Sequence, residues 1–118
     1  MVKILVVDDA YFVRIKMRGF LEVKGYQVLD AANGEEALSI YELEKPDIVF
    51  CDITMPVMDG LTTLKRLTET HKGAKVVMLT SVGEQAVLME ALSSGAKNFL
   101  VKPFEEDKVL EIIHSLMK

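Results

Sequence analysis

The sequence contains a single cysteine, Cys51, so it cannot form an internal disulfide. Neither its two histidines nor this cysteine is spaced like the ligands of a zinc site. Long hydrophobic runs are also missing, since the longest contain four residues, as in 4–7 and 48–51. No segment is long enough to span a bilayer, and the N-terminus lacks the layout of a signal peptide. We therefore expect a cytoplasmic protein that does not enter a membrane.

Positive charge is not in excess either. The chain has 14 Lys and Arg residues against 18 Asp and Glu residues, a formal net charge of −4. The basic residues are scattered, and no run is longer than Lys65-Arg66. This distribution argues against binding to nucleic acid, whose backbone requires a basic patch. With 50% hydrophobic residues in a chain of 118, the composition fits one folded domain covering 1–118.

Short apolar segments alternate with stretches of helical periodicity. The segments are 4–7, 28–32, 48–51, 76–79 and 99–101. They are rich in Val, Ile and Leu and show little alternation, which is typical of strands buried on both faces of a parallel sheet. Between and after them, apolar residues recur at helical spacing, most clearly in 109–116. The alternation predicts an α/β fold with (βα)₅ order, in which right-handed crossovers place helices on both faces of a doubly wound sheet.

The residues at the predicted boundaries agree with this interpretation. Asn33 is expected to cap the start of a helix over about 35–44, and Pro46 to follow its end. Gly25 and Gly95 are expected to cap the C-terminal ends of the first and fourth helices.

Polar residues follow four of the five predicted strands. They are Asp8, Asp9, Asp52, Thr80, Ser81 and Lys102. In an open parallel sheet, ligands bind outside the carboxyl ends of the strands, where these residues lie. A single acid at such a position often only caps a helix. The combination of three acids, two hydroxyl groups and an amine instead favours a functional site.

Three converging carboxylates repel one another, because two unit charges ~4 Å apart interact by about 4 kcal/mol at an effective dielectric of 20. Oxygen-only ligands favour a hard cation, Mg²⁺ first, with Mn²⁺ and Ca²⁺ as alternatives. A carboxylate such as Asp52 can also attack phosphorus and form an aspartyl-phosphate. A cation, the Lys102 ammonium and the Thr80 hydroxyl are the kinds of group that stabilise a transferring phosphoryl group.

The same residues fall within longer motifs that resemble a known family. These are Val7-Asp8-Asp9, the segments 52–60 (DITMPVMDG) and 95–104 (GAKNFLVKPF), and Thr80-Ser81. In this order and over the whole chain, they resemble the receiver domains of two-component response regulators. The resemblance implies a five-stranded parallel sheet in the flavodoxin-like order 2-1-3-4-5, for which flavodoxin and CheY are standard examples.

The resemblance also assigns roles to the metal-binding residues. It implies that Asp52 is the phosphoacceptor and a metal ligand. Asp9 would be the other direct carboxylate ligand of Mg²⁺, Asp8 would act through water, and Thr54 would contribute its backbone carbonyl.

Three residues in or directly after the last two predicted strands complete the set that the resemblance implies. Thr80 would be the switch hydroxyl, Lys102 the phosphate-binding lysine and Phe99 the switch aromatic residue. The Lys102–Pro103 bond is expected to be cis, an isomer that proline tolerates.

The partners follow from the same resemblance. A histidine kinase would phosphorylate Asp52, and a downstream protein would bind the surface of the fourth helix, fifth strand and fifth helix. A phosphatase would be a further partner, and the chain would act as a monomer. The stretches 8–14 and 83–85 and the single-domain layout are similar to CheY-like receivers of chemotaxis, whose target is a flagellar motor switch protein.

Other interpretations remain open at this stage. The alternatives to a role in chemotaxis are a phosphorelay carrier and a stand-alone receiver that regulates another enzyme. A phosphatase with an aspartyl nucleophile is a different class, but such enzymes usually have a second acid where this chain has Thr54. A dinucleotide-binding module would need a glycine-rich turn in place of 8–11. We expect no enzymatic activity beyond phosphorylation and dephosphorylation of the chain itself.

Overall fold

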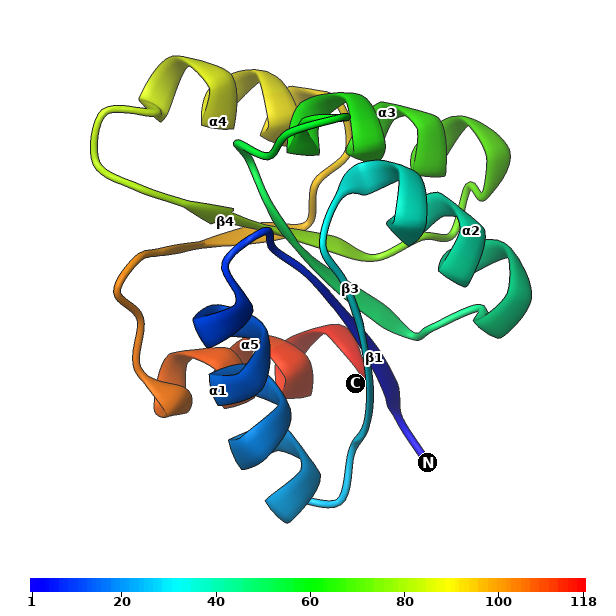
Figure 1. Cartoon of the computed structure of the whole chain (residues 1–118), viewed down its shortest axis with the longest axis vertical. Helices are drawn as coiled ribbons and strands as arrows, with labels where there is room; N and C mark the ends of the chain where they lie inside the picture. The colour runs from blue at the N-terminus through cyan, green and yellow to red at the C-terminus, as the bar shows by residue number, and fades with distance from the viewer.

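Every strand is followed by a helix in the computed structural model, which describes residues 1–118 (Figure 1). The strands are β1 (Lys3–Val7), β2 (Gln27–Ala31), β3 (Ile48–Asp52), β4 (Val76–Thr80) and β5 (Asn98–Val101). The helices are α1 (Tyr11–Val23), α2 (Gly34–Glu44), α3 (Gly60–Thr70), α4 (Gln85–Ser93) and α5 (Glu106–Leu116). The (βα)₅ order predicted from the sequence is confirmed.

All five strands are parallel and lie in the order β2-β1-β3-β4-β5. This is the order that the family resemblance implied. The chain goes outward from β1 to β2 and then crosses back to β3 on the other side of β1. Strand order therefore reverses between β1 and β3, and their carboxyl ends border the crevice in which ligands bind in such folds.

The sheet is covered on both faces, by α2, α3 and α4 on one side and by α1 and α5 on the other (Figure 1). Successive residues of a strand point to opposite faces, so β1 supplies both cores. Leu5 and Val7 belong to the cluster under α2, α3 and α4, whereas Ile4 and Val6 belong to the cluster under α1 and α5. This two-sided burial explains the continuous apolar runs. None of the helices has the length and apolar character needed to cross a bilayer.

The predicted helix boundaries are confirmed within a residue. The Asn33 side chain accepts a hydrogen bond of 2.9 Å from the Glu36 N–H, and α2 begins at the intervening Gly34. Gly25 and Gly95 have φ angles of 94° and 116°, left-handed values that glycine adopts without steric cost. They follow the ends of α1 and α4 and let the chain turn back toward the next strand.

Candidate functional site

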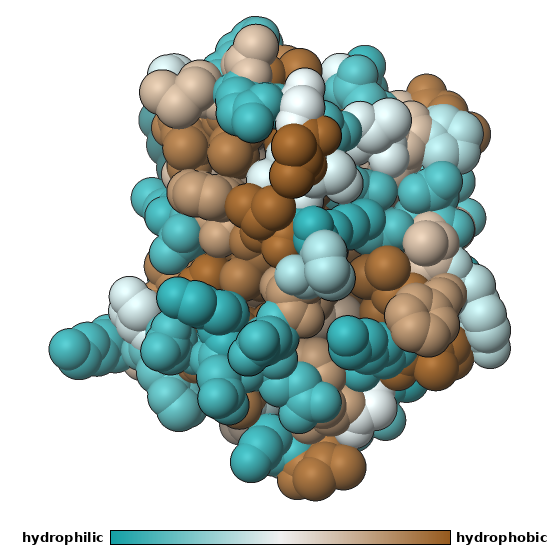
Figure 2. Space-filling model, turned by 90° about the vertical axis from the view of Figure 1, so that its left-hand side faces the viewer, coloured by the Kyte–Doolittle hydropathy of each residue, from teal (hydrophilic) through white to brown (hydrophobic).

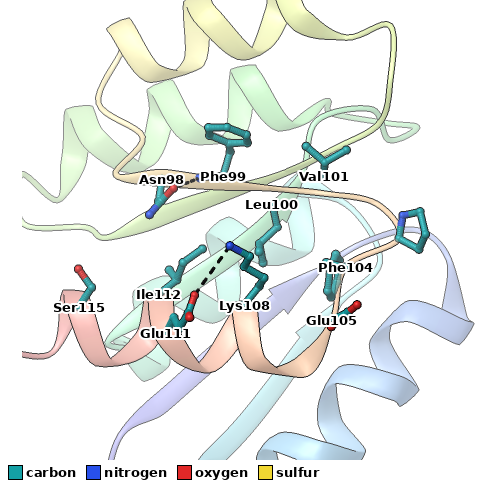
Figure 3. Close-up of a pocket in the computed structure, with 11 residues that line it drawn as sticks. Asn98, Phe99, Leu100, Val101, Phe104, Glu105, Lys108, Glu111, Ile112 and Ser115 are labelled. Atoms are coloured by element: carbon teal, nitrogen blue, oxygen red, sulfur yellow. Dashed lines mark hydrogen bonds and ion pairs between the residues drawn. The ribbon is translucent and has the colours of Figure 1, made fainter.

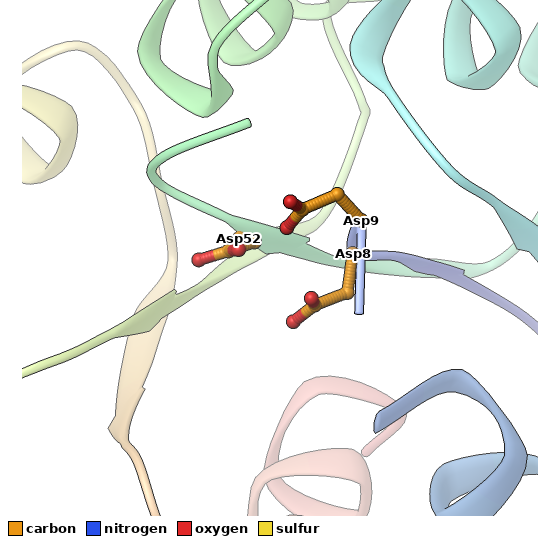
Figure 4. A group of neighbouring side chains, drawn as sticks. All are labelled: Asp8, Asp9 and Asp52. Atoms are coloured by element: carbon orange, nitrogen blue, oxygen red, sulfur yellow. The ribbon is translucent and has the colours of Figure 1, made fainter. Parts of the chain in front are cut away.

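Three carboxyl groups converge at the ends of β1 and β3 (Figure 4). Asp8 and Asp9 follow β1 directly, and Asp52 is the last residue of the neighbouring β3. One carboxylate oxygen from each residue lies within 4.8 Å of the others. Asp8 is completely buried and Asp52 nearly so, whereas Asp9 is exposed. The cluster is therefore buried on the side of the sheet and open to solvent at Asp9.

The start of α3 fixes the backbone at Asp52. The Gly60 N–H donates a hydrogen bond of 2.7 Å to the carbonyl of Ile53, and a Cβ at Gly60 would overlap the Asp52 carbonyl oxygen. Asp59 caps the helix by accepting a 2.8 Å hydrogen bond from the Thr62 N–H. Only glycine allows this approach, so Gly60 does more than begin a helix.

Lys102 reaches into the acidic cluster from the end of β5. Its Nζ lies 2.7 Å from Asp8 Oδ2 and 3.4 Å from Asp52 Oδ2. The other Asp8 oxygen accepts a 2.9 Å hydrogen bond from the Ala10 N–H, and the Lys102 ammonium is the one partner of Oδ2. The ammonium of Lys102 is thus closer to the Asp8 carboxylate than to the Asp52 carboxylate, and it compensates the charge of Asp8 more fully. The Lys102–Pro103 peptide bond is cis, as expected.

These neighbours shift the pKa values of the nucleophile candidate and of the lysine. Burial, and then the charge of Asp8, raise the pKa of Asp52 to about 6, against the opposing effect of Lys102. Burial lowers the pKa of Lys102, but the hydrogen bond to Asp8 and the charges of both acids outweigh it and leave that pKa above its ordinary value. The lysine therefore stays charged, and Asp52 is mostly ionised at neutral pH.

The cluster suits a hard divalent cation. With its three acids ionised, one ammonium leaves two negative charges uncompensated in a partly buried space. The groups that face this space are carboxylate oxygens, which Mg²⁺ prefers over nitrogen or sulfur ligands.

Thr80 lies beside this cluster but makes its hydrogen bonds elsewhere. It is the last residue of β4 and is buried, and its hydroxyl donates to the Ser81 carbonyl (3.4 Å) and to Glu84 Oε1 (3.2 Å). Glu84 Oε2 accepts a 2.6 Å hydrogen bond from the Thr54 hydroxyl. That bond, followed by those from Ser81 and Thr80, lowers the pKa of Glu84, so the side chain is a carboxylate at neutral pH.

Phe99 lies apart from the acids, on β5. Its side chain is 39% exposed and, like that of Val101, points to the α4 side of the strand, whereas Leu100 points toward α5 (Figure 3). Phe99 also lines a groove of about 710 Å³ between β5 and α5. The side of the molecule that carries the loops after β4 and β5, at the left of Figure 1, has apolar and polar side chains interspersed over its surface (Figure 2).

The structure thus brings Asp8, Asp9, Asp52 and Lys102 into one cluster, with Thr80 and Thr54 beside it and Phe99 on a separate surface. Two contributing residues were missed by the sequence reasoning. Glu84 joins Thr54 to Thr80, and Arg14 donates a 2.7 Å hydrogen bond from Nη1 to the Asp8 carbonyl. An acid shortly after the polar end of a strand was the one signal available for Glu84.

Comparison with known proteins defines the class to which this fold and site belong. The family model of the response regulator receiver domain matches residues 4–114. The chain therefore belongs to the response regulator receiver family, and it is a two-component signalling protein.

Individual relatives cover nearly the whole chain. Protein CcdB of Bacillus subtilis is 46% identical over 99% of this chain and 98% of its own length. Chemotaxis protein CheY of the same organism is 41% identical over 98% and 97%. Sporulation initiation phosphotransferase F, also of B. subtilis, is 38% identical over 94% and 90%. Among solved structures, Vibrio cholerae chemotaxis protein CheY4 superimposes with a TM-score of 0.91 at 32% identity, covering 98% of both chains.

Proposed function

We propose that residues 1–118 form a single receiver domain that accepts a phosphoryl group on Asp52 and thereby changes its binding to a partner protein. The donor is the phosphohistidine of a histidine kinase, the reaction depends on Mg²⁺, and the protein works as a monomer in the cytoplasm. The observation that carries the proposal is the cluster itself, in which a buried carboxylate lies among two further acids and a charged lysine.

The chain's own residues account for the transfer step. An ionised oxygen of Asp52 attacks phosphorus, and the bond from phosphorus to the donor nitrogen breaks with its electron pair staying on that nitrogen. The donor ring, protonated at its other nitrogen, leaves as neutral imidazole. No general base is required, because the pKa of Asp52 of about 6 leaves the carboxylate ionised at neutral pH. Lys102 lies 3.4 Å from Asp52 Oδ2, where its ammonium can donate to a phosphoryl oxygen. Thr80 supplies a hydroxyl for another oxygen. The chain catalyses its own phosphorylation and dephosphorylation and no other reaction.

The roles of the cation ligands are taken from the family resemblance. Asp9, Asp52 and the Thr54 backbone carbonyl would hold Mg²⁺ or Mn²⁺ directly, and Asp8 would hold it through water. A bound divalent cation supplies positive charge for the phosphoryl oxygens in the transition state.

The output is proposed to be chemotactic, through the flagellar motor switch protein. The named CheY relative, at 41% identity over 98% of the chain, supports this assignment. The receiving surface would be the α4–β5–α5 face, where Phe99 and Val101 are partly exposed beside the groove. A phosphatase would end the signal. A second candidate is a relay carrier, which is supported by the similarity to sporulation initiation phosphotransferase F.

Two experiments test these proposals. Incubation with acetyl phosphate and Mg²⁺ should add the mass of one phosphoryl group, and chelation of the metal or Asp52→Asn should abolish the gain. Equal labelling of the variant would contradict the phosphoacceptor assignment. Affinity capture with and without beryllofluoride separates the two outputs, because flagellar-motor components support chemotaxis and a histidine phosphotransferase supports a relay.

A further inference from the structure

Glu84 directly precedes α4. Both of its carboxylate oxygens accept hydrogen bonds from groups beside the acidic cluster. Oε2 accepts the 2.6 Å hydrogen bond from the Thr54 hydroxyl. Oε1 accepts from the Ser81 N–H at 2.6 Å and from the Thr80 hydroxyl at 3.2 Å. One side chain therefore connects the loop after β3, the end of β4 and the start of α4. Hydrogen bonds to an ionised carboxylate are among the stronger ones in proteins.

The Thr80 hydroxyl carries a single proton, so it cannot donate fully to two sites at once. In this structure its acceptors are Ser81 and Glu84 rather than Asp52. Asp52 lies opposite Leu79 in the register of β3 and β4, which places Thr80 one residue beyond the phosphoacceptor candidate on the neighbouring strand. A phosphoryl group on Asp52 would bring new acceptor oxygens to this side. Those oxygens and the Glu84 carboxylate compete for the same proton.

We propose that Glu84 is a positioning residue of the switch, whose carboxylate holds the Thr80 hydroxyl toward α4 and opposes its transfer to a phosphoryl group on Asp52. This inference rests on the proposed phosphorylation of Asp52. Phosphorylation also adds negative charge near Glu84, which repels the carboxylate. Because Glu84 binds Thr54 as well as Thr80, its release would free the loop after β3 and the start of α4 together.

The test is a titration of the full chain with beryllofluoride in Mg²⁺, followed by NMR of the backbone amides. Glu84→Ala removes the competing acceptor, so we expect it to bind the phosphoryl mimic about tenfold more tightly than the wild type. Glu84→Gln keeps an acceptor oxygen without the charge and should give an intermediate gain. Glu90→Gln is the matched control, because this acid lies on α4 and pairs with Lys65 at 2.8 Å, outside the network. Its affinity should equal that of the wild type.

A double-mutant cycle separates positioning from a general effect on stability. If Glu84 acts through the Thr80 hydroxyl, the gain from Glu84→Ala should vanish in a Thr80→Ala background. A Glu84→Ala affinity equal to that of the control, or a gain that persists without the Thr80 hydroxyl, would overturn the inference. A wild-type chain that binds no beryllofluoride would instead refute the proposed function, and this failure is visible before any substitution is made.

Discussion

Asp52 combines two properties that oppose each other, because it is almost fully buried and yet its proposed role as a nucleophile requires it to be ionised. Burial, and then the charge of Asp8, raise its pKa to about 6, so ionisation of this carboxyl group costs more free energy in the folded state than in the unfolded chain. Lys102 relieves it only in part, since the ammonium lies closer to Asp8 than to Asp52. In the absence of a metal ion, the ionised acidic cluster therefore destabilises the folded state. Binding of a cation, or phosphorylation, would change this destabilisation.

This conflict predicts that Asp52→Asn stabilises the metal-free protein at pH 8. The folded-state pKa of Asp52 is raised above its ordinary value of 3.8, so the folded state binds more protons than the unfolded state between the two pKa values. The wild type therefore loses stability as the pH rises from about 4 to about 6, and the loss is complete above that range. The difference should be on the order of 2–3 kcal/mol at pH 8, from about 1.4 kcal/mol per pKa unit, and should vanish below pH 4. Denaturant unfolding with a chelator present measures it.

The control for that experiment is Asp107→Asn, because Asp107 is an exposed acid in the first turn of α5. Its free energy of unfolding at pH 8 should stay close to that of the wild type. A variant at Asp52 no more stable than the wild type at pH 8 would show that its burial does not strain the folded state.

At the scale of elements, the connection from β3 to α3 is constrained at several positions. Its two ends are set by the contact between Gly60 and the backbone of Asp52 and by the Asp59 cap. Between them, Val57 adopts a left-handed φ of 70°, which is unusual for a β-branched residue. The connection thus fixes the backbone of Asp52 through its contact with Gly60, and its own backbone is strained at Val57.

We expect Gly60→Ala to destabilise the fold by about 1–3 kcal/mol and to reduce phosphorylation of Asp52. The added methyl group would overlap the Asp52 carbonyl oxygen, so either α3 or the end of β3 must shift. Gly19→Ala is the matched control, since nothing lies within 4 Å of a Cβ at this position in α1. That change should stabilise by about 0.5–1 kcal/mol, as alanine does in a helix. Unchanged labelling and stability in Gly60→Ala would refute the close contact.

Relief of the strain at Val57 should stabilise the protein. Asparagine tolerates the left-handed region better than valine, so Val57→Asn is expected to gain about 1 kcal/mol and a few degrees in Tm. Val82→Asn makes the same change at another exposed valine that lacks a positive φ, and it should gain nothing. Thermal unfolding of the two variants decides the matter, and equal Tm values would argue against strain at Val57.

At the scale of the whole molecule, the arrangement of helices on both faces of the sheet could be predicted from the sequence. Strands that are buried on both faces appear as continuous apolar runs. β1, β3 and β4 appear as continuous apolar runs, whereas the edge strand β2 is weaker because it is only partly buried and carries Asp30. Asp52 and Thr80 were expected just after their strands but are the last strand residues, since each still takes part in the pairing of its strand with a neighbour.

The contacts of Glu84 and Arg14 could not be predicted in this way. The hydrogen bond from Thr54 to Glu84 joins residues 30 positions apart and depends on the path of the loop through Gly83, which has a φ of 99°. Periodicity describes buried faces and gives no information about such loops. The acids and Lys102 were found because strand ends converge by topology alone.

The most direct measurement is to locate the phosphoryl group after reaction with acetyl phosphate and Mg²⁺. Borohydride reduction converts an aspartyl-phosphate to homoserine, which tandem mass spectrometry can assign to one residue. We predict homoserine at position 52, with none at Asp8, Asp9 or Asp59. Modification of one of those acids instead, or a phosphate on a serine or threonine, would contradict the account.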